Sequence, residues 1–497
     1  MSATSAHVGK GLFLIGLQIG LFLILMLTGC DQSLTVTVRI GGSGTGSVAS
    51  SPAGINCVSP CRVGQASFTA KKTAPTVVLT ATPNPGTVFA GWGGACTGSS
   101  PSCTVSASGS ATAVAFFRTL SVSAGAFHTC ALRLDGTVAC WGRNDHGQIG
   151  QDPRQRASVN TPVNVPGLQS VVQIAAGAFH TCALLVDGSV ECWGLNRDYE
   201  LGAPGVPDAS DSFTPITTRA SISNGGHLAV SVAAGGYHAC SVLDNGQGLC
   251  WGYDANNQIG AGYTTSAPTP YIVSSPANFI AFTGGAYHTC GLDNSGSVWC
   301  WGYNADGEVG NAQTTQPPGP QQLSPFSAPV AGLGGALGAG QVGLAVYGGY
   351  HTCAVVSDGT VWCWGYNGHF ELGRAGFSSG YSPVPLQVSG IDGTTRKAIS
   401  VTAGAYHSCA LLSDATAECW GNNKESEIGA GLTTNFVEVP TAVAANGILA
   451  ISAGGDHNCA IFAGTSGTIK CWGLNDDGEA GVGNNNTVPT PTDVRFF

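Results

Sequence analysis

The chain has 497 residues, of which only 9% are charged, and its formal net charge at pH 7 is −10. Soluble proteins usually carry about 25% charged residues. A coiled coil or a long helical array is rich in Glu and Lys, so the low charge content excludes these two classes. With 18 Lys and Arg, the chain lacks the clustered positive charge that meets phosphates, and we expect no nucleic-acid partner. The 19 cysteines indicate an oxidising compartment. Because their number is odd, at least one cysteine cannot be part of a disulfide within the chain.

The N-terminal segment has the pattern of an export signal. Residues 11–29 are uncharged and mostly apolar, and Lys10 precedes them, as in a secretory signal peptide. Their end, Leu27-Thr28-Gly29-Cys30, resembles a bacterial lipobox. The resemblance implies a signal peptide over 1–29, a lipidated linker over 30–32, and a chain anchored through Cys30 in a membrane of the cell envelope, facing the periplasm or the cell surface. An uncleaved signal anchor is the alternative.

Residues 33–118 form a separate unit, in which short alternating strands are divided by Gly, Ser and Pro. Phe89-Ala90-Gly91-Trp92 and Cys103-Thr104-Val105 are among the pieces that resemble the divergent bacterial repeat related to the internalin B repeat. This resemblance implies a β-grasp-like spacer or adhesive module.

The four cysteines of this unit allow three pairings. We expect the two local ones, Cys57–Cys61 and Cys96–Cys103. A metal site of four thiolates is the alternative, but the spacings do not give two CxxC pairs and exported thiols would be oxidised.

From residue 119 to 497 the chain repeats one motif seven times. The first copy is AGAFHTCALRLDGTVACWGRNDHGQIG, over 124–150, and the mean spacing of the repeat histidines, (457 − 128)/6, is about 55 residues. A period near 50 with several short strands per unit is typical of a propeller blade. The sequence therefore predicts an all-β fold with a seven-bladed β-propeller behind the small β-rich domain.

The pattern G-x-x-H-x-x-A-L-x-x-D-G-x-V-x-x-W-G-x-N-x-x-G-Q-I-G resembles the regulator of chromosome condensation repeat over about three quarters of the chain. The resemblance implies four-stranded blades. It also implies that the C-terminal TPTDVRFF returns to complete the first blade. Some relatives exchange guanine nucleotides on Ran through a protruding loop, so exchange activity is an alternative that rests on the fold alone.

A hairpin register accounts for the remaining cysteines. Cys130 and Cys140 flank Leu134-Asp135-Gly136, and a three-residue loop of this kind places the two cysteines opposite each other, at a Cα separation within disulfide range. The last copy has two extra loop residues, which preserve the facing because the strand period is two. In the sixth copy, Ala415 stands where the turn glycine is expected. The predicted pairs are Cys130–Cys140, Cys182–Cys192, Cys240–Cys250, Cys290–Cys300, Cys353–Cys363, Cys409–Cys419 and Cys459–Cys471.

The same register places each repeat histidine opposite a glycine, whose missing side chain is expected to leave room for the imidazole. A catalytic or metal-binding role does not need seven equivalent copies, so we expect these side chains to be structural and hydrogen-bonded within or between blades. Neither a metal nor a cofactor is predicted. The repeat histidines are His128, His180, His238, His288, His351, His407 and His457, and the repeat tryptophans, expected in the blade cores, are Trp141, Trp193, Trp251, Trp301, Trp364, Trp420 and Trp472.

The sequence contains no G-x-S-x-G, P-loop or H-E-x-x-H motif. The acidic loop Asn304-Ala305-Asp306-Gly307-Glu308 lacks the full spacing of a calcium loop and reads as an ordinary blade turn. We therefore expect a non-enzymatic scaffold that binds a protein or glycan through blade loops. The longest inter-repeat stretches contain the candidate binding loops, which are Pro317–Gly340, Ala203–Asp211 and Asn224–His227. A hydrolase or lyase site in the propeller channel is the alternative.

Overall fold

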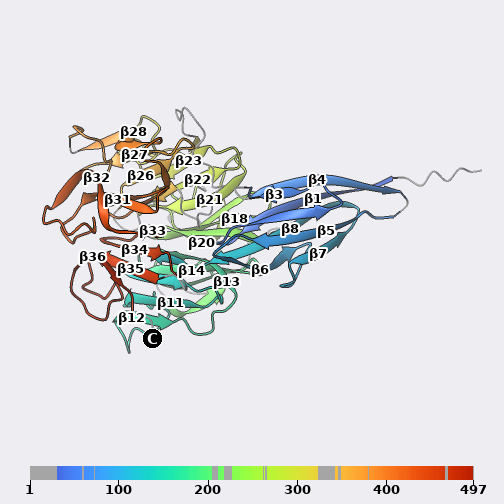
Figure 1. The fold of residues 1–497 in the computed structure, drawn as a ribbon, viewed down its shortest axis with the longest axis horizontal. Helices are drawn as coiled ribbons and strands as arrows, with labels where there is room; N and C mark the ends of the chain where they lie inside the picture. The colour runs from blue at the N-terminus through green and yellow to red at the C-terminus, as the bar shows by residue number, and fades with distance from the viewer. Residues whose placement is uncertain are drawn as a thin grey trace, which may run out of the picture.

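The chain is built from β-strands, as predicted. The computed structural model describes residues 31–495 except 59–60, 72, 204–210, 218–225, 261, 263–265, 323–341, 345–348, 379 and 465–467. The regular elements of the described residues are all β-strands, and they form nine four-stranded sheets (Figure 1). Cys30 and the predicted signal peptide lie outside the described residues. No helix in the described ranges has the length and apolar character needed to span a membrane.

Two sheets precede the repeats and pack on each other. The first has the order β4-β1-β8-β6 and the second β3-β2-β5-β7. Buried and exposed residues alternate along β5, and its inward-facing Val77 and Leu79 share one core with Leu34, Val36 and Val38 of β1. The strands are β1 (Asp31–Gly41), β2 (Gly46–Ser51), β3 (Asn56–Val58), β4 (Val63–Lys71), β5 (Thr76–Pro83), β6 (Thr87–Gly94), β7 (Ser102–Ser106) and β8 (Gly109–Thr119).

The β-grasp expectation for this unit is wrong. A β-grasp packs a helix against one sheet, whereas here a second sheet takes that place and supplies half of the core. The reason lies in the period of the buried residues, which is two in both halves of the unit and gives each half a single apolar sheet face to cover.

The repeats form seven further four-stranded antiparallel sheets, each made of four strands consecutive in the chain. The first three are β9 (Ser121–Ala124), β10 (His128–Leu132), β11 (Val138–Arg143) and β12 (Ser158–Asn164); β13 (Val171–Ala176), β14 (His180–Leu185), β15 (Val190–Gly194) and β16 (Ser212–Thr217); and β17 (Ala229–Ala234), β18 (His238–Leu243), β19 (Gly248–Tyr253) and β20 (Ser266–Ile272).

The other four sheets follow the same plan. They are β21 (Phe279–Gly284), β22 (His288–Asp293), β23 (Val298–Gly302) and β24 (Gln321–Gln322); β25 (Val342–Leu344), β26 (His351–Val355), β27 (Thr360–Tyr366) and β28 (Tyr381–Asp392); β29 (Ala398–Ala403), β30 (His407–Leu412), β31 (Thr416–Asn422) and β32 (Phe436–Asn446); and β33 (Ile448–Ala453), β34 (His457–Phe462), β35 (Thr468–Gly473) and β36 (Val488–Asp493).

The sheets are arranged around a ring that closes without an exchanged strand. The last sheet meets the first through the hydrogen bond from the Ala124 amide to the Ser452 hydroxyl, 3.0 Å long, and through contacts of β33 and β34 with β9. The expectation that the C-terminal segment completes the first blade is wrong, because β36 pairs with β35 in its own sheet. The inner place in the first sheet is already taken by β9, which the chain reaches directly from β8.

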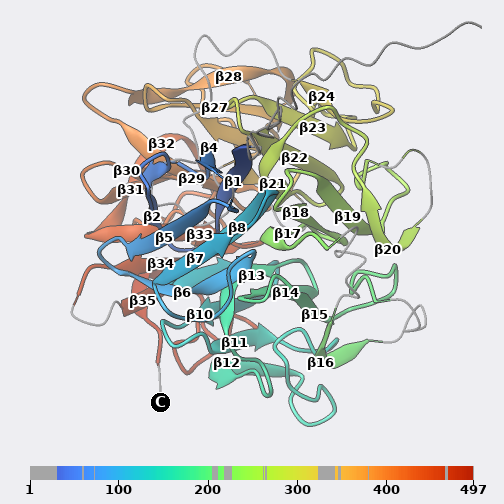
Figure 2. The ribbon, with the colours of Figure 1, turned by 90° about the vertical axis from the view of Figure 1, so that its right-hand side faces the viewer.

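The N-terminal sheets rest against one side of this ring. The amide of Gly42 donates to the Val230 carbonyl (3.2 Å) and that of Ser43 to the Val172 carbonyl (2.7 Å), while Phe116 is fully buried in one cluster with both valines. Val172 and Val230 lie where the inner strands β13 and β17 begin. Viewed from this side, the N-terminal strands lie in front of the ring (Figure 2).

Candidate binding face of the propeller

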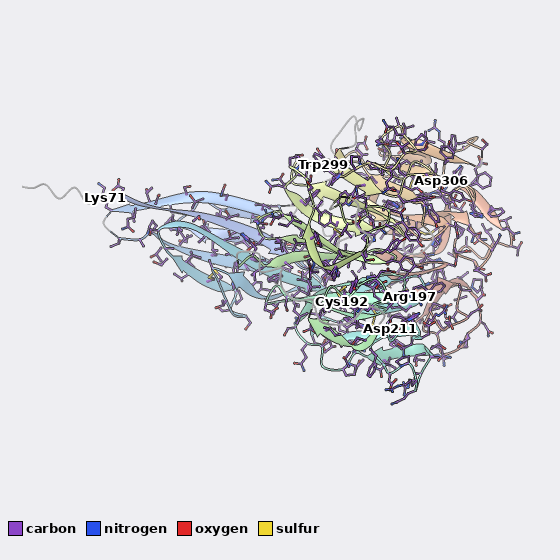
Figure 3. All side chains as sticks on the ribbon, turned by 180° about the vertical axis from the view of Figure 1, so that it is seen from behind. Lys71, Cys192, Arg197, Asp211, Trp299 and Asp306 are labelled. Carbon is purple, nitrogen blue, oxygen red and sulfur yellow. A yellow bond between two sulfur atoms is a disulfide. The ribbon has the colours of Figure 1, made fainter. Side chains whose placement is uncertain are left out.

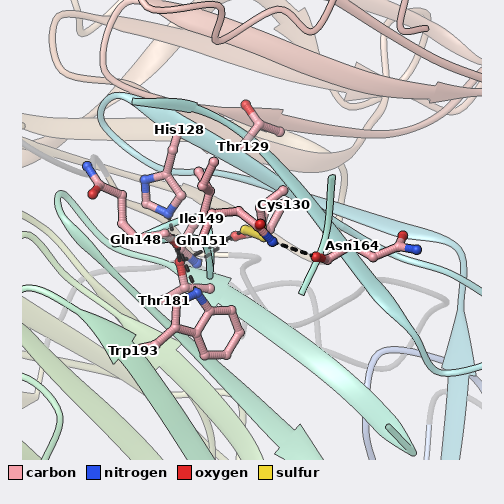
Figure 4. The surroundings of a disulfide bond; sticks show 12 residues. His128, Thr129, Cys130, Gln148, Ile149, Gln151, Asn164, Thr181 and Trp193 are labelled. Carbon is pink, nitrogen blue, oxygen red and sulfur yellow. Dashed lines mark hydrogen bonds between the residues drawn. A yellow bond between two sulfur atoms is a disulfide. The ribbon is translucent and has the colours of Figure 1, made fainter. Parts of the chain in front are cut away.

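The hairpin of every repeat is joined by a disulfide in the predicted register. Cys130 pairs directly opposite Cys140, and the seven repeat disulfides all have a Cα separation of 4.1 Å. Figure 4 shows the Cys130 bridge beside His128 and Thr181. The N-terminal cysteines are bonded as Cys57–Cys61 and Cys96–Cys103. These cysteines are held in bridges and are not available as metal ligands.

The repeat histidines link neighbouring blades. The Nε2 atom of His128 lies 2.7 Å from the Thr181 hydroxyl in the next sheet, and His457 reaches Thr129 across the closure at 2.8 Å. His238, His288, His351 and His407 make the same bond to Thr289, Thr352, Ser408 and Asn458. Burial lowers the pKa of His128 to about 3, so the imidazole is neutral at physiological pH, as a structural role requires.

His180 departs from this pattern. The equivalent partner in the next sheet is Ala239, which has no hydroxyl, and both ring nitrogens of His180 lack a side-chain partner. The backbone of His238 is the polar group beside it. Between the second and third sheets the side-chain link is therefore missing, and a hydrogen bond between His180 and the His238 backbone stands in its place.

In the six repeats where both residues are described, the room for the imidazole comes from a different glycine than predicted. The glycines opposite the histidines are confirmed, as in His128–Gly142, but a Cβ at Gly142 would meet the His128 backbone, and its φ is +98°. The ring itself rests on the glycine three residues earlier, where a Cβ at Gly125 would come within 2.8 Å of His128 Cε1. The packing reason is that the imidazole points toward the next sheet rather than across its own hairpin.

The repeat tryptophans tie the loops of one blade to the core of the next. Trp193 donates its indole N–H to the Gln148 carbonyl at 2.9 Å, and Trp141 donates to Glu479 across the closure at 2.7 Å. All seven tryptophans are fully buried, as expected for blade cores.

The acidic loops after the Trp-Gly pairs are turns, as predicted. In one of them Asn304 Oδ1 accepts from the Val309 amide (2.9 Å), and the Glu308 carboxylate accepts from the Asp306 amide (3.0 Å). Glu308 is buried, which raises its pKa to about 8. Among the described residues, no group of three or more His, Cys, Asp or Glu is placed to hold a metal ion.

Aromatic side chains line the opposite end of the blades from the N-terminal sheets. The inner strand β13 begins beside Ser43 and ends at Ala176, so the residue before each repeat histidine lies on the far face. Figure 3 shows Asp306 of this face well away from Lys71 of the N-terminal sheets. The far-face aromatic residues before the histidines are Phe127, Phe179, Tyr237, Tyr287, Tyr350 and Tyr406, and we call them the aromatic belt.

Neighbouring rings of the belt touch from blade to blade. Phe127 and Phe179 have centroids 5.2 Å apart, and Tyr237 stacks on Tyr287 at 5.5 Å with planes 14° apart. Tyr350 continues the row at 6.4 Å from Tyr287. All the belt residues are half-buried. Such rings combine large contact area with a polar tip, which suits recognition of another molecule.

The belt opens into a cavity of about 250 Å³ that is lined by residues of the second to fifth sheets. A second set of tyrosines, directly after the Trp-Gly pairs, forms its outer side: Tyr303 packs edge-on to Tyr350 at 5.7 Å. We call this cavity the tyrosine pocket. Its lining is Tyr237, Tyr253, Tyr287, Tyr303 and Tyr350 with Asp198 and Asn256.

Acidic side chains lie in and beside the tyrosine pocket. Burial and the nearby Glu308 and Asp306 raise the pKa of Tyr303, and burial with neighbouring tyrosines and Glu308 raises that of Tyr350 to about 12. Both phenols are therefore neutral at physiological pH. Asp198 contributes a carboxylate to the wall and accepts from the Ser266 hydroxyl at 3.2 Å.

The candidate binding loops predicted from the sequence lie mostly outside the described residues, and their described ends contact loops of this face: Asp211 lies 2.8 Å from His146, and the Pro317 carbonyl accepts from Asn257 at 3.2 Å. Of Pro317–Gly340, residues 323–340 lie outside the described part, and so do 204–210 of Ala203–Asp211. Sequence reasoning missed the aromatic belt, although its signal was present as a Phe or Tyr directly before six of the seven repeat histidines.

A ring of repeated four-stranded sheets with inter-blade hydrogen bonds defines the main part of the chain as a β-propeller. The family model of the RCC1-like domain matches residues 82–410 and 157–497. The chain therefore belongs to the RCC1-like domain family, and the resemblance to the chromosome condensation repeat is confirmed.

Two Arabidopsis thaliana proteins are similar over most of the chain. The mitochondrial RCC1 domain-containing protein RUG3 is 26% identical over 390 residues, covering 76% of this chain and 70% of that protein. The ultraviolet-B receptor UVR8 is 26% identical over 383 residues with the same shares.

Among solved structures, yeast RCC1 (Prp20) bound to Kap60 aligns with a TM-score of 0.62 and 22% identity, over 73% of this chain and 85% of that one. Human WBSCR16 aligns with a TM-score of 0.59 and 22% identity, over 70% of this chain and 88% of its own. At these identities the likeness concerns the fold.

Proposed function

We propose that the chain is an exported, lipid-anchored scaffold, with a seven-bladed propeller that binds a protein partner without catalysis. One observation carries the binding part: the N-terminal sheets occupy one side of the ring, and the opposite side presents the aromatic belt. Interfaces are enriched in Tyr and other aromatic residues, which supply contact area at low entropic cost. Relatives support a protein partner, since yeast Prp20 is described bound to Kap60 and with binding to Gsp1p and histones.

The anchor part of the proposal rests on the lipobox-like sequence ending in Cys30. On this proposal the two N-terminal sheets stand between the membrane and the propeller, because β1 begins at Asp31. The belt then faces away from the lipid surface. Two acyl chains or more give stable anchoring, whereas one gives only marginal binding.

Expression of the full chain in a bacterium that processes lipoproteins tests the anchor. The wild type is expected to enter the detergent phase and to yield an N-terminal peptide that starts at Cys30 and carries the mass of its acyl chains. The variant Cys30→Ala should stay unacylated. A wild-type protein with an unmodified Cys30 contradicts the anchor without touching the binding proposal.

Photo-crosslinking tests the binding face. A photoreactive amino acid at Tyr366, on the aromatic face, is expected to trap a defined protein on envelopes of the source cell, and purified partner should then compete for the crosslink. The matched control is Ile272, which is 44% exposed but pairs with Leu249 near the other end of its blade. Equal crosslinking from both positions, or from neither, contradicts a partner on this face.

A further inference from the structure

We propose that the tyrosine pocket is the site where the scaffold takes a cationic side chain, an arginine or lysine, from its protein partner. The inference rests on the proposed protein-binding function and names the chemistry of its central contact. A cation over a tyrosine face is attracted by the negative ring face, and more strongly where water is partly excluded.

The chain itself shows that this face accepts cations between its rings. In the first blade, Arg143 places its guanidinium 5.2 Å from the Phe127 ring centroid and 5.7 Å from that of Phe179. Asp145 completes that arrangement with an ion pair of 2.7 Å. A second cation is Lys424, whose ammonium lies 5.4 Å from the Phe436 ring.

The tyrosine pocket has the aromatic rings of this arrangement without the cation. Tyr237 and Tyr287 hold the belt positions of Phe127 and Phe179, two blades further on. The position of Arg143, directly after Trp-Gly, is taken by Tyr253 and Tyr303, which add ring faces instead of a charge. Asp198 supplies a carboxylate in the wall. The cation that the first blade provides from its own chain would here come from a partner.

Charge around the face favours the same occupant. One loop position recurs in all seven repeats, two residues after Asn144 or its equivalent, and it carries four carboxylates and neither Lys nor Arg. The residues at this position are His146, Asp198, Asn256, Asp306, His369, Glu425 and Asp477. With a chain net charge of −10, a basic partner is drawn to this face at long range.

The test uses the purified chain labelled with 3-fluorotyrosine and a short Gly-Ser peptide that carries one arginine. The neutral isostere is the same peptide with citrulline, which keeps the shape and loses the charge. We expect the arginine peptide to bind at millimolar concentration with ¹⁹F shifts at the pocket tyrosines, and the citrulline peptide to bind at least fivefold more weakly.

Variants distinguish the contribution of the aromatic rings to peptide affinity from that of the carboxylate. Tyr287→Leu and Asp198→Asn should each weaken the arginine peptide at least fivefold, whereas Tyr303→Phe should retain most of the affinity because the ring remains. The surface variant Tyr271→Leu, at a site 43% exposed outside the pocket, should have no effect. Unchanged disulfide content and melting temperature show that each variant is folded.

Equal affinity for the arginine and citrulline peptides overturns the proposal, and so does full affinity in Asp198→Asn. Binding of neutral oligosaccharides with no binding of the arginine peptide also overturns it and assigns the pocket to a glycan. If the partner still crosslinks from Tyr366 in those cases, the scaffold function stands and only the pocket chemistry fails.

Discussion

At Ala239 the network of inter-blade hydrogen bonds has a gap. Six repeat histidines reach a Thr, Ser or Asn side chain of the next sheet, and His180 faces Ala239 instead. A buried polar atom without a partner costs about 1–3 kcal/mol. The second and third sheets therefore lack a side-chain hydrogen bond that neighbouring sheets have. The N-terminal sheets rest on the other end of the same two sheets, at Val172 and Val230.

Replacing Ala239 by threonine should close this gap. Thr289 occupies the equivalent place in the next sheet and bonds His238 at 2.7 Å, so Ala239→Thr is expected to raise the free energy of unfolding by about 1 kcal/mol. Denaturant unfolding checks the gain. The control Ala239→Val has the same shape without the hydroxyl, and an equal gain in both variants would show that packing, not the hydrogen bond, is responsible.

The disulfide-bonded hairpin is the element that the repeat conserves from blade to blade. In the fourth repeat, for example, Cys290 of β22 lies directly opposite Cys300 of β23, and neither residue has any exposed surface. The sixth hairpin tolerates Ala415 in place of glycine by taking a positive φ of +65°, so the turn keeps its geometry at the expense of local strain.

Removing one bridge tests its contribution. The double variant Cys290→Ala/Cys300→Ala is expected to lose at most about 2–3 kcal/mol, because the loop that the bridge closes is short and the hairpin is already local. Denaturant midpoints without reductant measure the loss. The single variant Cys290→Ala is the control and should expose one more free thiol on denaturation than the wild type, whereas more than one free thiol in the wild type would contradict the pairing of all cysteines except Cys30.

At the scale of the whole molecule, the attachment of the N-terminal sheets leaves one propeller face open. Phe116 carries that attachment, since it is fully buried with Val172 and Val230 of the ring. A Cβ at Gly41 would come within 3.1 Å of the Val230 carbonyl oxygen of the ring, so this glycine allows the close approach of the two parts.

Phe116→Ala should therefore release the N-terminal sheets from the propeller. Loss of a buried phenylalanine costs about 3–5 kcal/mol, and here part of that cost falls on the contact between the two parts. Small-angle scattering should show a larger radius of gyration. Leu79→Ala, in the core between the two N-terminal sheets, is the control and should lower stability without changing the overall dimensions; equal scattering of Phe116→Ala and wild type would contradict this assignment.

Buried titratable groups predict a stability maximum near neutral pH. Burial lowers the pKa of His128, His238, His288, His351 and His457 to about 3 and that of His180 and His407 to about 4. The unfolded chain takes up these protons below about pH 6.5, so stability falls as pH drops from there. Burial raises the pKa of Glu200, Glu308 and Glu427 to about 8 and that of Glu479 to about 7.

For these carboxyl groups the folded chain holds the extra protons, and their stabilisation is lost as pH rises toward 8. Between pH 4.5 and 6.5 the seven histidines outweigh the four carboxyl groups, which places the maximum at about pH 6–7. Denaturant unfolding from pH 4 to 8.5 checks the curve. A stability that keeps rising from pH 6.5 to 8.5 would contradict the burial of neutral carboxyl groups.

Local sequence patterns determined much of this molecule by themselves. The repeat, its hairpin register and the pairing of Cys130 with Cys140 all follow from turn length and the two-residue period of strands, which act over a few residues. The structural role of the histidines followed from their sevenfold recurrence. Each of these features depends on residues close together in the chain.

Only the tertiary structure decided the features that join distant residues. The closure of the ring through Ala124 and Ser452 without an exchanged strand, the second sheet in place of a β-grasp helix, and the gap at His180 depend on which sheet packs against which. The tyrosine pocket gathers residues from Asp198 to Tyr350. The curvature of the propeller brings these residues together, and the sequence pattern along the chain does not specify which residues of different blades become neighbours in this way.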